Sequence, residues 1–368
     1  MELPFLASES RLRPALYGVI HALVDAACVV AVVRGSHGLN LALSAFWVVA
    51  GYDLLAFALQ FPLGLLVDRL RLARLSMIAG TVLAAVVLAP VSIPALTTMA
   101  LAGVGNALFH LGAGSLVLRS SDGRAAPAGV FVGPGALGLG LGLWMGRTGQ
   151  GSTFPIYLAL IVAVVALITM DRPVAPARIT RAPAPLAPAL AILALLLAST
   201  GIRSFVGFGA CFQCPSGLAV AIGLPVAACV GKLVGGLVAD RTGWLRASVA
   251  ALLLSLPLIA FSGGSLYLAL PGVLLFQSTM AVTLVAVYAL MPAWPATAFG
   301  LPSLALIAGS FPTFYPQGKQ FFGRGTFVGL IALSTAMLAL ALFRLHGLRS
   351  AKQVAREQTK AEAGAVGT

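Results

Sequence analysis

Two related stretches indicate the architecture of this chain: GLLVDRLRLAR, residues Gly64–Arg74, and GLVADRTGWLR, residues Gly236–Arg246. Both contain G-x-x-x-D-R, and the second copy follows the first by close to half of the chain. In each, a long apolar run ends in a short basic turn. Glycine lets neighbouring helices approach closely, and aspartate can accept hydrogen bonds at the N-terminus of a following helix. We therefore expect two related halves.

The composition is that of an integral membrane protein. Hydrophobic residues make up 60% of the chain, charged residues only 9%, and the mean hydropathy is +1.01. Soluble domains carry about 25% charged residues. The net charge of +13 could suggest nucleic acid, but the basic residues fall in short gaps between apolar runs. That arrangement is typical of loops beside an anionic lipid leaflet, so we expect a lipid bilayer and no nucleic acid as partner.

The fold predicted from these runs is an all-α membrane protein with twelve transmembrane helices in two pseudo-symmetric six-helix halves. A span needs roughly twenty apolar residues. The twelve predicted spans are 14–33, 42–63, 75–94, 97–118, 127–146, 153–170, 188–210, 217–238, 246–262, 266–290, 297–316 and 325–344. The predicted domains are an N-terminal half (1–170), a proline-rich cytoplasmic linker (171–187), a C-terminal half (188–344) and a basic cytoplasmic tail (345–368). The first span lacks a clear cleavage site and is expected to be retained.

The distribution of Lys and Arg predicts the orientation. With the N-terminus inside, 17 of the 23 basic residues lie in inner segments, four lie in outer segments and two lie within spans. Because inner loops are enriched in Lys and Arg, both termini are expected to be cytoplasmic. The predicted location is the cell inner (plasma) membrane, with multiple passes.

The repeated loop resembles the signature between helices 2–3 and 8–9 of the major facilitator superfamily. The resemblance covers essentially the whole chain and implies alternating access of the two halves. It also implies a cytoplasmic gate formed by the two motif copies, namely Gly64, Asp68, Arg69, Gly236, Asp240 and Arg241. The first copy has Leu70-Arg71 where the family usually has glycine after D-R-x, which makes its turn looser.

Two further runs refine the resemblance. GVGNALFHLGAG (Gly103–Gly114) resembles a run of the fosmidomycin-resistance-type branch, with Leu111 in place of proline. GVFVGPGALGLGLG (Gly129–Gly142) resembles the glycine-proline motif in helix 5 of exporting antiporters, although its glycine spacing differs. Close helix packing with a kink explains the second run equally well.

Charged and polar residues interrupt several predicted spans. In VIHALVDAACVV (Val19–Val30), His21 and Asp25 lie one helical turn apart. A charge at the bilayer centre costs about 2.5–3.5 kcal/mol even on the gentlest scale, so such residues usually face a cavity or each other. The resemblance implies that helices 1, 4, 7 and 10 line the central cavity, which would collect most of these residues. The predicted proton-coupling residues are Asp25, His21 and Asp53, and the predicted substrate-binding residues are Arg203, Lys232, Asn106, His110, Gln277 and Thr283.

Two other interpretations of these charges stay open. Arg203 could pair with Asp25, and Lys232 with Asp53, to hold helices together or to form breakable gates. His21, Asp25 and His110 could instead bind a divalent metal ion, although the two cations in the same cavity would oppose it. No cofactor or resident metal is expected. The C-x-x-C of Cys211 and Cys214 fits two small apolar residues near a helix end, with oxidation or metal binding as the alternative.

The predicted function is secondary active transport of a small anionic or zwitterionic solute, coupled to protons, with export favoured over import. The sequence contains no nucleophile elbow, nucleotide-binding loop or H-E-x-x-H, so we do not expect an enzyme. Without an ATP-binding domain, the energy would come from a gradient. The alternatives are an importer or uniporter of the same fold and a divalent metal transporter. From another class, a non-transporting membrane receptor or membrane enzyme remains open. The expected partners are the solute, protons and the bilayer, and a monomer is expected by analogy.

Overall fold

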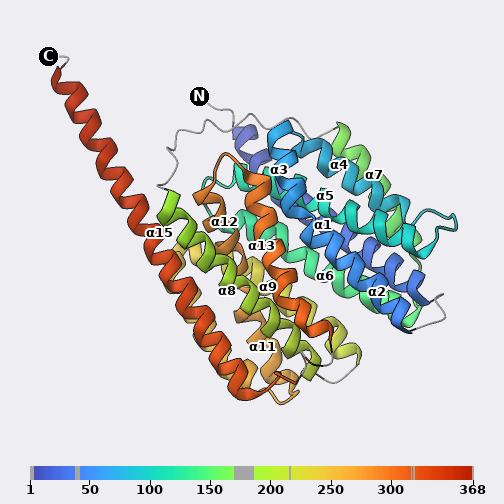
Figure 1. The fold of residues 1–368 in the computed structure, drawn as a ribbon. Helices are drawn as coiled ribbons and strands as arrows, with labels where there is room; N and C mark the ends of the chain where they lie inside the picture. Colours follow the sequence, from blue (N-terminus) through green and yellow to red (C-terminus); the bar gives the residue numbers. More distant parts are fainter. Residues whose placement is uncertain are drawn as a thin grey trace.

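The computed structural model describes the backbone of residues 4–37, 42–169, 186–214, 217–315, 317 and 320–366. Side chains are described for residues 12–37, 46–169, 186–211, 214, 217–315, 317, 320–348 and 350. Over these residues the chain forms an all-helical bundle (Figure 1). The predicted linker, 171–187, falls almost entirely outside the described residues.

The first half of the chain forms one side of the bundle. Its elements are α1 (Pro4–His37), α2 (Ala42–Asp53), a π-helical segment (Leu54–Ala58), α3 (Gln60–Leu70), α4 (Ala73–Val86), α5 (Ala95–Ser120), α6 (Ala126–Thr148) and α7 (Phe154–Thr169). The second half contains α8 (Leu186–Gln213), α9 (Leu218–Thr242), α10 (Trp244–Ala260), α11 (Leu266–Gln277), α12 (Met280–Leu290), α13 (Pro295–Ser310), a 3₁₀ segment (Phe311–Phe314) and α15 (Arg324–Val366).

These elements make the predicted twelve spans. In the described part of the chain, nine helical segments are long and apolar enough to cross a membrane, and α4, α7 and α10 are shorter apolar helices. One span, Phe46–Leu70, combines α2, the π-helical segment and α3, so it continues past the predicted end at residue 63. Another, Leu266–Leu290, combines α11 and α12, which are separated at Ser278 and Thr279.

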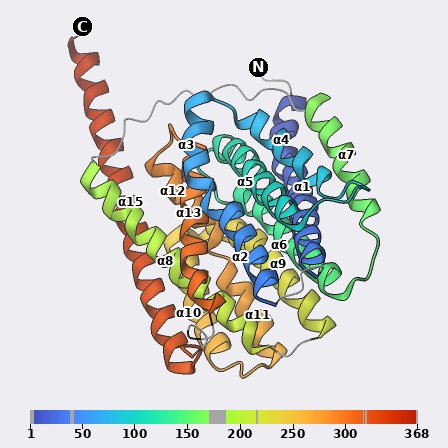
Figure 2. The ribbon, with the colours of Figure 1, turned by 45° about the vertical axis from the view of Figure 1, so that its right-hand side comes forward.

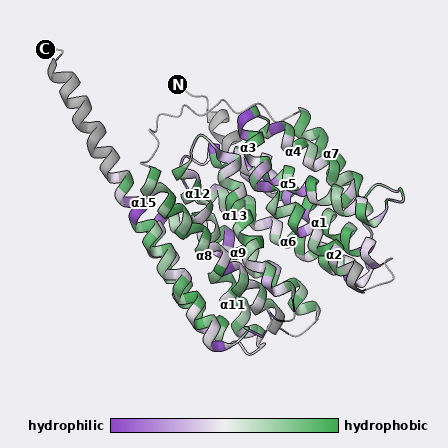
Figure 3. Cartoon of the chain, in the orientation of Figure 1, coloured by the Kyte–Doolittle hydropathy of each residue, from purple (hydrophilic) through white to green (hydrophobic). Residues whose placement is uncertain are grey.

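The two halves lie next to each other along the length of the bundle. In Figures 1 and 2, α1 to α7 (blue to green) occupy one side and α8 to α15 (yellow-green to red) the other. Apolar residues dominate the helices, as Figure 3 shows in green, with purple polar residues mainly near helix ends and at a few interior points. Many large apolar side chains are exposed, among them Val162, Leu254 and Phe343, which suits a hydrocarbon environment rather than water.

Glycines bring the halves into direct backbone contact at two places. A Cβ atom at Gly129 of α6 would lie 2.4 Å from the Lys232 carbonyl oxygen of α9, and one at Gly300 of α13 would lie 2.3 Å from the Gln60 carbonyl oxygen of α3. Real Cβ atoms do not approach other atoms so closely, so any larger residue would separate these helices. The pairs α6–α9 and α3–α13 are therefore the close seams between the halves.

The last helix is much longer than a membrane span. Only Arg324–Leu348 of α15 forms the apolar part, and the helix continues to Val366 through the region predicted as a separate tail, 345–368. Figures 1 and 2 show this extension projecting beyond the rest of the bundle. The first turns of α1 and the end of α15 lie at the same end of the bundle (Figure 1), as expected for an even number of spans.

Candidate functional site

The most concentrated polar site joins α1 to α5 inside the N-terminal half. Asp25 is its centre, with Oδ2 3.2 Å from His21 Nε2 and Oδ1 3.8 Å from His110 Nε2. Asn106 Nδ2 donates to Asp25 Oδ1 at 2.8 Å. The side chains of His21, Asp25 and His110 are only 6%, 14% and 9% exposed. Four of the predicted site residues thus form one buried cluster.

The second ring nitrogen of each histidine fixes its protonation pattern. His21 Nδ1 lies 2.9 Å from the Phe131 carbonyl oxygen, and His110 Nδ1 lies 2.8 Å from the Asn106 carbonyl oxygen. A carbonyl oxygen can only accept, so both Nδ1 atoms carry hydrogen. A neutral imidazole then has a lone pair on Nε2, the atom that faces Asp25. The short contact of His21 Nε2 with a carboxylate oxygen therefore requires a proton between them, bound to one group or the other.

Aromatic rings enclose this cluster. The His21 ring centroid lies 4.3 Å from that of His110 and 4.9 Å from that of Phe131. Phe299, from α13 in the other half, lies 6.3 Å from His110 and 5.9 Å from Phe131. Space for His21 depends on Gly135, where a Cβ atom would lie 2.3 Å from His21 Nε2. The aromatic enclosure was not predicted from the sequence, since phenylalanines in apolar spans give no signal of their partners.

Lys232 brings a positive charge from α9 to this cluster. It lies within electrostatic range of both Asp25 and His110, and its side chain is partly exposed. Among the described side chains it forms no ion pair, so its ammonium group is not in direct contact with the Asp25 carboxylate. Within the cluster, Asn106 Oδ1 is buried without a hydrogen-bond partner. The described residues thus leave one cation close to the cluster without an ion-pair partner and one acceptor of the cluster without a donor.

Arg203 lies in a separate polar network within the C-terminal half. It is 6% exposed, and its guanidinium donates to the hydroxyl groups of Thr200, Thr279 and Thr283, while Nε donates to the Ser199 carbonyl oxygen. Thr279 lies at the interruption between α11 and α12, so Arg203 holds the broken span against α8. The alternative pairing of Arg203 with Asp25 is wrong for this structure, because the guanidinium group of Arg203 donates to threonine hydroxyl groups instead.

The remaining predicted site residues are not brought to the cluster. Asp53, the last residue of α2, has no hydrogen bond or ion pair among the described residues, and it does not pair with Lys232. Gln277 ends α11 and likewise has no such contact in the described part of the chain. Sequence reasoning missed Gln60, which is fully buried with Oε1 unpartnered beside the π-helical segment. Gln60 could have been identified from the sequence as a single amide side chain within an apolar span.

The two motif aspartates connect the halves reciprocally. Asp68 of α3 accepts hydrogen bonds from the backbone N–H groups of Ala296 (3.0 Å) and Thr297 (2.8 Å) and from the Thr297 hydroxyl (2.9 Å). Asp240 of α9 accepts from the N–H groups of Ala125 and Ala126, both at 2.8 Å. Each aspartate thus caps the N-terminus of a helix in the opposite half, α13 or α6, where the helix dipole also favours a negative charge.

The other members of the two motifs divide into packing and exposed residues. A Cβ atom at Gly64 would lie 3.0 Å from the Ala296 carbonyl oxygen, and one at Gly236 would lie 2.8 Å from the Ala125 carbonyl oxygen. Arg69 and Arg241 are exposed, and no hydrogen bond of theirs occurs among the described residues. The expectation that each aspartate caps the following helix is wrong, because both cap a helix of the other half.

Comparison with solved structures identifies this arrangement. No protein-family model matches the sequence, and no curated protein matches it significantly. The chain superposes on FucP, a major facilitator superfamily transporter solved in the outward conformation, with a TM-score of 0.61 and 12% identity over 91% of this chain and 98% of FucP. It also superposes on the human organic anion transporter MFSD10 (TETRAN), with a TM-score of 0.63 and 15% identity over 94% and 100% of the two chains. This chain has the major facilitator fold.

The glycine-rich run Gly129–Gly142 lies in α6, the fifth span, and has a packing role. Its glycines alternate between two neighbours: a Cβ atom at Gly138 would lie 2.0 Å from the Ala22 carbonyl oxygen of α1, and one at Gly140 would lie 2.3 Å from Pro225 of α9. Gly129 and Gly135 contact α9 and α1 in the same way. Close packing of α6 between both halves accounts for the run, so it does not by itself indicate export.

The cluster also has the donor set of a metal site. The ligand atoms of His21, Asp25 and His110 lie within 4.8 Å of one another. Both histidines present Nε2 while Nδ1 faces a carbonyl oxygen, which is how proteins usually orient metal-binding histidines. Nearby Lys232 opposes a cation electrostatically. A proton and a metal ion would compete for the same nitrogen atoms.

Proposed function

We propose that this chain is a secondary transporter that moves a small anionic or zwitterionic solute by alternating access, coupled to protons. The observation that carries the proposal is the buried Asp25 cluster facing Lys232 across the boundary between the halves. The fold supports it, since a solved variant of the E. coli protein FucP, which also superposes on this chain, is described as a fucose:proton symporter and MFSD10 as an organic anion transporter.

Asp25 and His21 are the proposed proton-coupling pair. His21 Nε2 and Asp25 Oδ2 lie 3.2 Å apart, so a proton held between them has two groups to which it can bind, and we infer that this pair takes up and releases the coupled proton during the cycle. His110 is close enough to share it. Asp53 remains a predicted second proton site on α2.

The solute would bind between the halves. Its anionic group would contact Lys232, whose ammonium group has no carboxylate partner among the described residues. An ammonium or hydroxyl group of the same solute would donate to Asn106 Oδ1, which is buried without a partner. Arg203 supplies a second buried positive charge, balanced only by hydroxyl and carbonyl groups, and a buried cation of that kind favours an anion. Gln277 and Thr283 remain predicted contacts beside it.

Alternating access would use the two reciprocal aspartate caps as the gate on the side of the signature loops. While Asp68 and Asp240 cap helices of the opposite half, that side is closed. Opening it requires breaking both caps. We retain the cytoplasmic assignment of this side, export, monomeric state and the fosmidomycin-resistance-type branch as predictions that rest on the sequence.

The proposal can be tested by ligand-induced thermal shift and by proton flux in proteoliposomes. A panel of small anionic and zwitterionic solutes is screened against wild type, Lys232→Gln and Asp25→Asn at about pH 5.5 and 7.5. Arg344→Gln is the control, because it removes one positive charge from an exposed position. We expect a solute that stabilises wild type and the control but not Lys232→Gln, and solute-driven proton flux that Asp25→Asn abolishes. Solute flux that is unchanged in Asp25→Asn would refute proton coupling at this cluster.

Divalent metal transport is the second candidate, favoured by the orientation of both imidazoles. In the same assay, Zn²⁺ is the probe, with His21→Ala and His110→Ala as variants. Stabilisation by Zn²⁺ that both variants abolish, with no response to any anion, would replace the first proposal. Stabilisation by an anion without flux would instead favour a receptor.

A further inference from the structure

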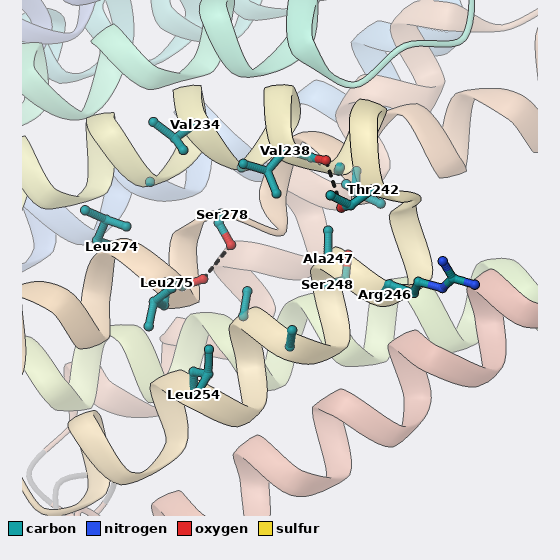
Figure 4. Close-up of a pocket in the computed structure, with 16 residues that line it drawn as sticks. Val234, Val238, Thr242, Arg246, Ala247, Ser248, Leu254, Leu274, Leu275 and Ser278 are labelled. Atoms are coloured by element: carbon teal, nitrogen blue, oxygen red, sulfur yellow. Dashed lines mark hydrogen bonds between the residues drawn. The ribbon is translucent and has the colours of Figure 1, made fainter.

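A groove on the outside of the C-terminal half lies apart from the Asp25 cluster. It encloses about 390 Å³ between α9 and α10, and the junction of α11 and α12 forms its floor (Figure 4). In Figure 4 Leu274 lies at one end of the groove and Arg246 at the other, near the turn that contains the second signature motif.

The walls of the groove are apolar and are exposed on the outside of the bundle. Val234 and Val238 of α9 are 43% and 40% exposed, and Leu254 of α10 is 60% exposed. Ser278 on the floor donates to the Leu275 carbonyl oxygen, so its hydroxyl is satisfied (Figure 4). The groove therefore offers an apolar surface along most of its length, with a positive charge at one end.

The matching region of the N-terminal half is closed by glycines. A Cβ atom at Gly80 of α4 would lie 2.3 Å from the Phe109 nitrogen of α5, and one at Gly112 would lie 2.3 Å from the Met77 nitrogen. When the two signature motifs are aligned, the corresponding positions in the C-terminal half are Leu252 and Leu284. Leucine side chains cannot permit that approach, so α10 stands further from α11 and α12, which opens the groove.

The wider spacing also leaves one serine hydroxyl without the hydrogen-bond partner that its counterpart has in the N-terminal half. In the N-terminal half Ser76 donates to the Leu108 carbonyl oxygen at 2.8 Å. Its counterpart in the same alignment is Ser248, which lines the groove. Ser248 is 2% exposed, and its hydroxyl has no hydrogen-bond partner. An unpartnered buried hydroxyl is costly, which points to a ligand atom that completes it.

A pair of equivalent arginines differs in the same way: the one in the N-terminal half is hydrogen-bonded, and among the described residues the one in the C-terminal half is not. Arg74 donates to the carbonyl oxygens of Leu167 and Ile168 at the end of α7, at 3.0 and 2.9 Å. Its counterpart, Arg246, is exposed and forms no hydrogen bond or ion pair among the described residues. The reason lies in α15, which continues to Val366, so the carbonyl groups at the matching level are bonded within the helix.

We propose that this groove binds an anionic phospholipid. An acyl chain lies against Val234, Val238 and Leu254, the phosphate contacts Arg246, and the Ser248 hydroxyl donates to a lipid oxygen. Arginine is well suited to phosphate, and the N-terminus of α10, which begins at Trp244, adds a favourable dipole. Inter-helix pockets with a basic residue at the membrane surface are suited to such head groups.

Native mass spectrometry of the purified, delipidated chain tests this proposal. The probes are phosphatidylglycerol, phosphatidylcholine with the same acyl chains, and inorganic phosphate. We expect phosphatidylglycerol to bind more tightly than phosphatidylcholine by about fivefold, the effect of one basic residue near the surface. Arg246→Gln should abolish the preference. Arg241→Gln should keep it, since Arg241 is exposed on the same turn but does not line the groove.

Two further variants test the groove itself. Val238→Trp should fill the groove and remove tight binding of both lipids, while Ser248→Ala, which removes only one oxygen, should weaken both. An unchanged lipid preference in Arg246→Gln, or an equal loss in Arg241→Gln, would overturn the proposal. Binding of inorganic phosphate that depends on Arg246 but not on Val238 would replace the lipid by a free anion. Size-exclusion profiles confirm that each variant is folded.

Discussion

Replacing Asp68 with asparagine should release one of the two contacts that close the bundle on the side of the signature loops. The carboxylate accepts three hydrogen bonds from α13, at 3.0, 2.8 and 2.9 Å. Hydrogen bonds to a charged group contribute about 1.5–3 kcal/mol each, against about 0.5–1.5 kcal/mol for neutral pairs. Asparagine keeps the shape but loses the charge, and its amide N–H₂ faces other donors.

The expected loss is therefore about 3 kcal/mol of contact energy, because three bonds each lose about 1 kcal/mol. This shifts the equilibrium between closed and open states on that side by roughly 100-fold. Asp240→Asn should act in the same direction with a smaller effect, since Asp240 accepts two backbone bonds at 2.8 Å and a longer one from Trp244 Nε1 at 3.2 Å. The double variant should open this side further than either single change.

Double electron–electron resonance measures this opening. Spin labels are placed at Leu75 and Ala250, which are exposed positions in α4 and α10 of opposite halves, after the four native cysteines have been replaced. Asp68→Asn should move the distance distribution to longer values. Arg69→Gln, the exposed neighbour, should leave it unchanged. An unchanged distribution in both aspartate variants, or an equal change in the control, would refute the capping argument.

Further predictions concern packing and the matched arginines. Gly135→Ala should abolish proton-coupled flux and lower the free energy of unfolding by about 1–3 kcal/mol, because the new methyl group displaces His21. Gly329→Ala is the control: the space around Gly329 is open, so this variant should be near wild type in both assays. Arg74→Gln should lower the free energy of unfolding of the delipidated protein by about 1–3 kcal/mol, because it removes the hydrogen bonds to the end of α7. Arg246→Gln should leave this free energy unchanged. Calorimetry compares the two variants, and equal effects would contradict the structural difference between the two halves.

Much of the fold could be predicted because its signals are local. Span length and apolar composition give twelve membrane helices, and the recurrence of G-x-x-x-D-R after about half of the chain gives two related halves. The partners of the motif could not be predicted. Asp68 and Thr297 are far apart in the sequence, and only the packing of α3 against α13 brings them together. The sequence identified the right aspartates and the wrong helices.

The candidate site was predictable to the extent that burial of charge is costly. The polar residues of α1 and α5 had to find partners, and the i, i+4 spacing of His21 and Asp25 already placed them together. Arg203 was different. Balancing formal charges suggested a carboxylate partner, but hydroxyl and carbonyl oxygens on α8, on α12 and at the junction before α12 satisfy the guanidinium. Many residue types can satisfy an arginine, so charge alone does not select its partner.

The position of α6 links the proposed proton site to the boundary between the halves. Through the Phe131 carbonyl oxygen and Gly135, α6 holds the His21 ring, and through Gly129 it contacts the backbone of Lys232. His21 and Asp25 lie on one helix, so movement of the halves about the α6–α9 seam leaves their contact intact. The same movement changes the separation of Asp25 from Lys232, which lies on α9. If the chain works as proposed, the electrostatic effect of Lys232 on the cluster differs between the two conformations, and by linkage proton occupancy shifts the balance between them.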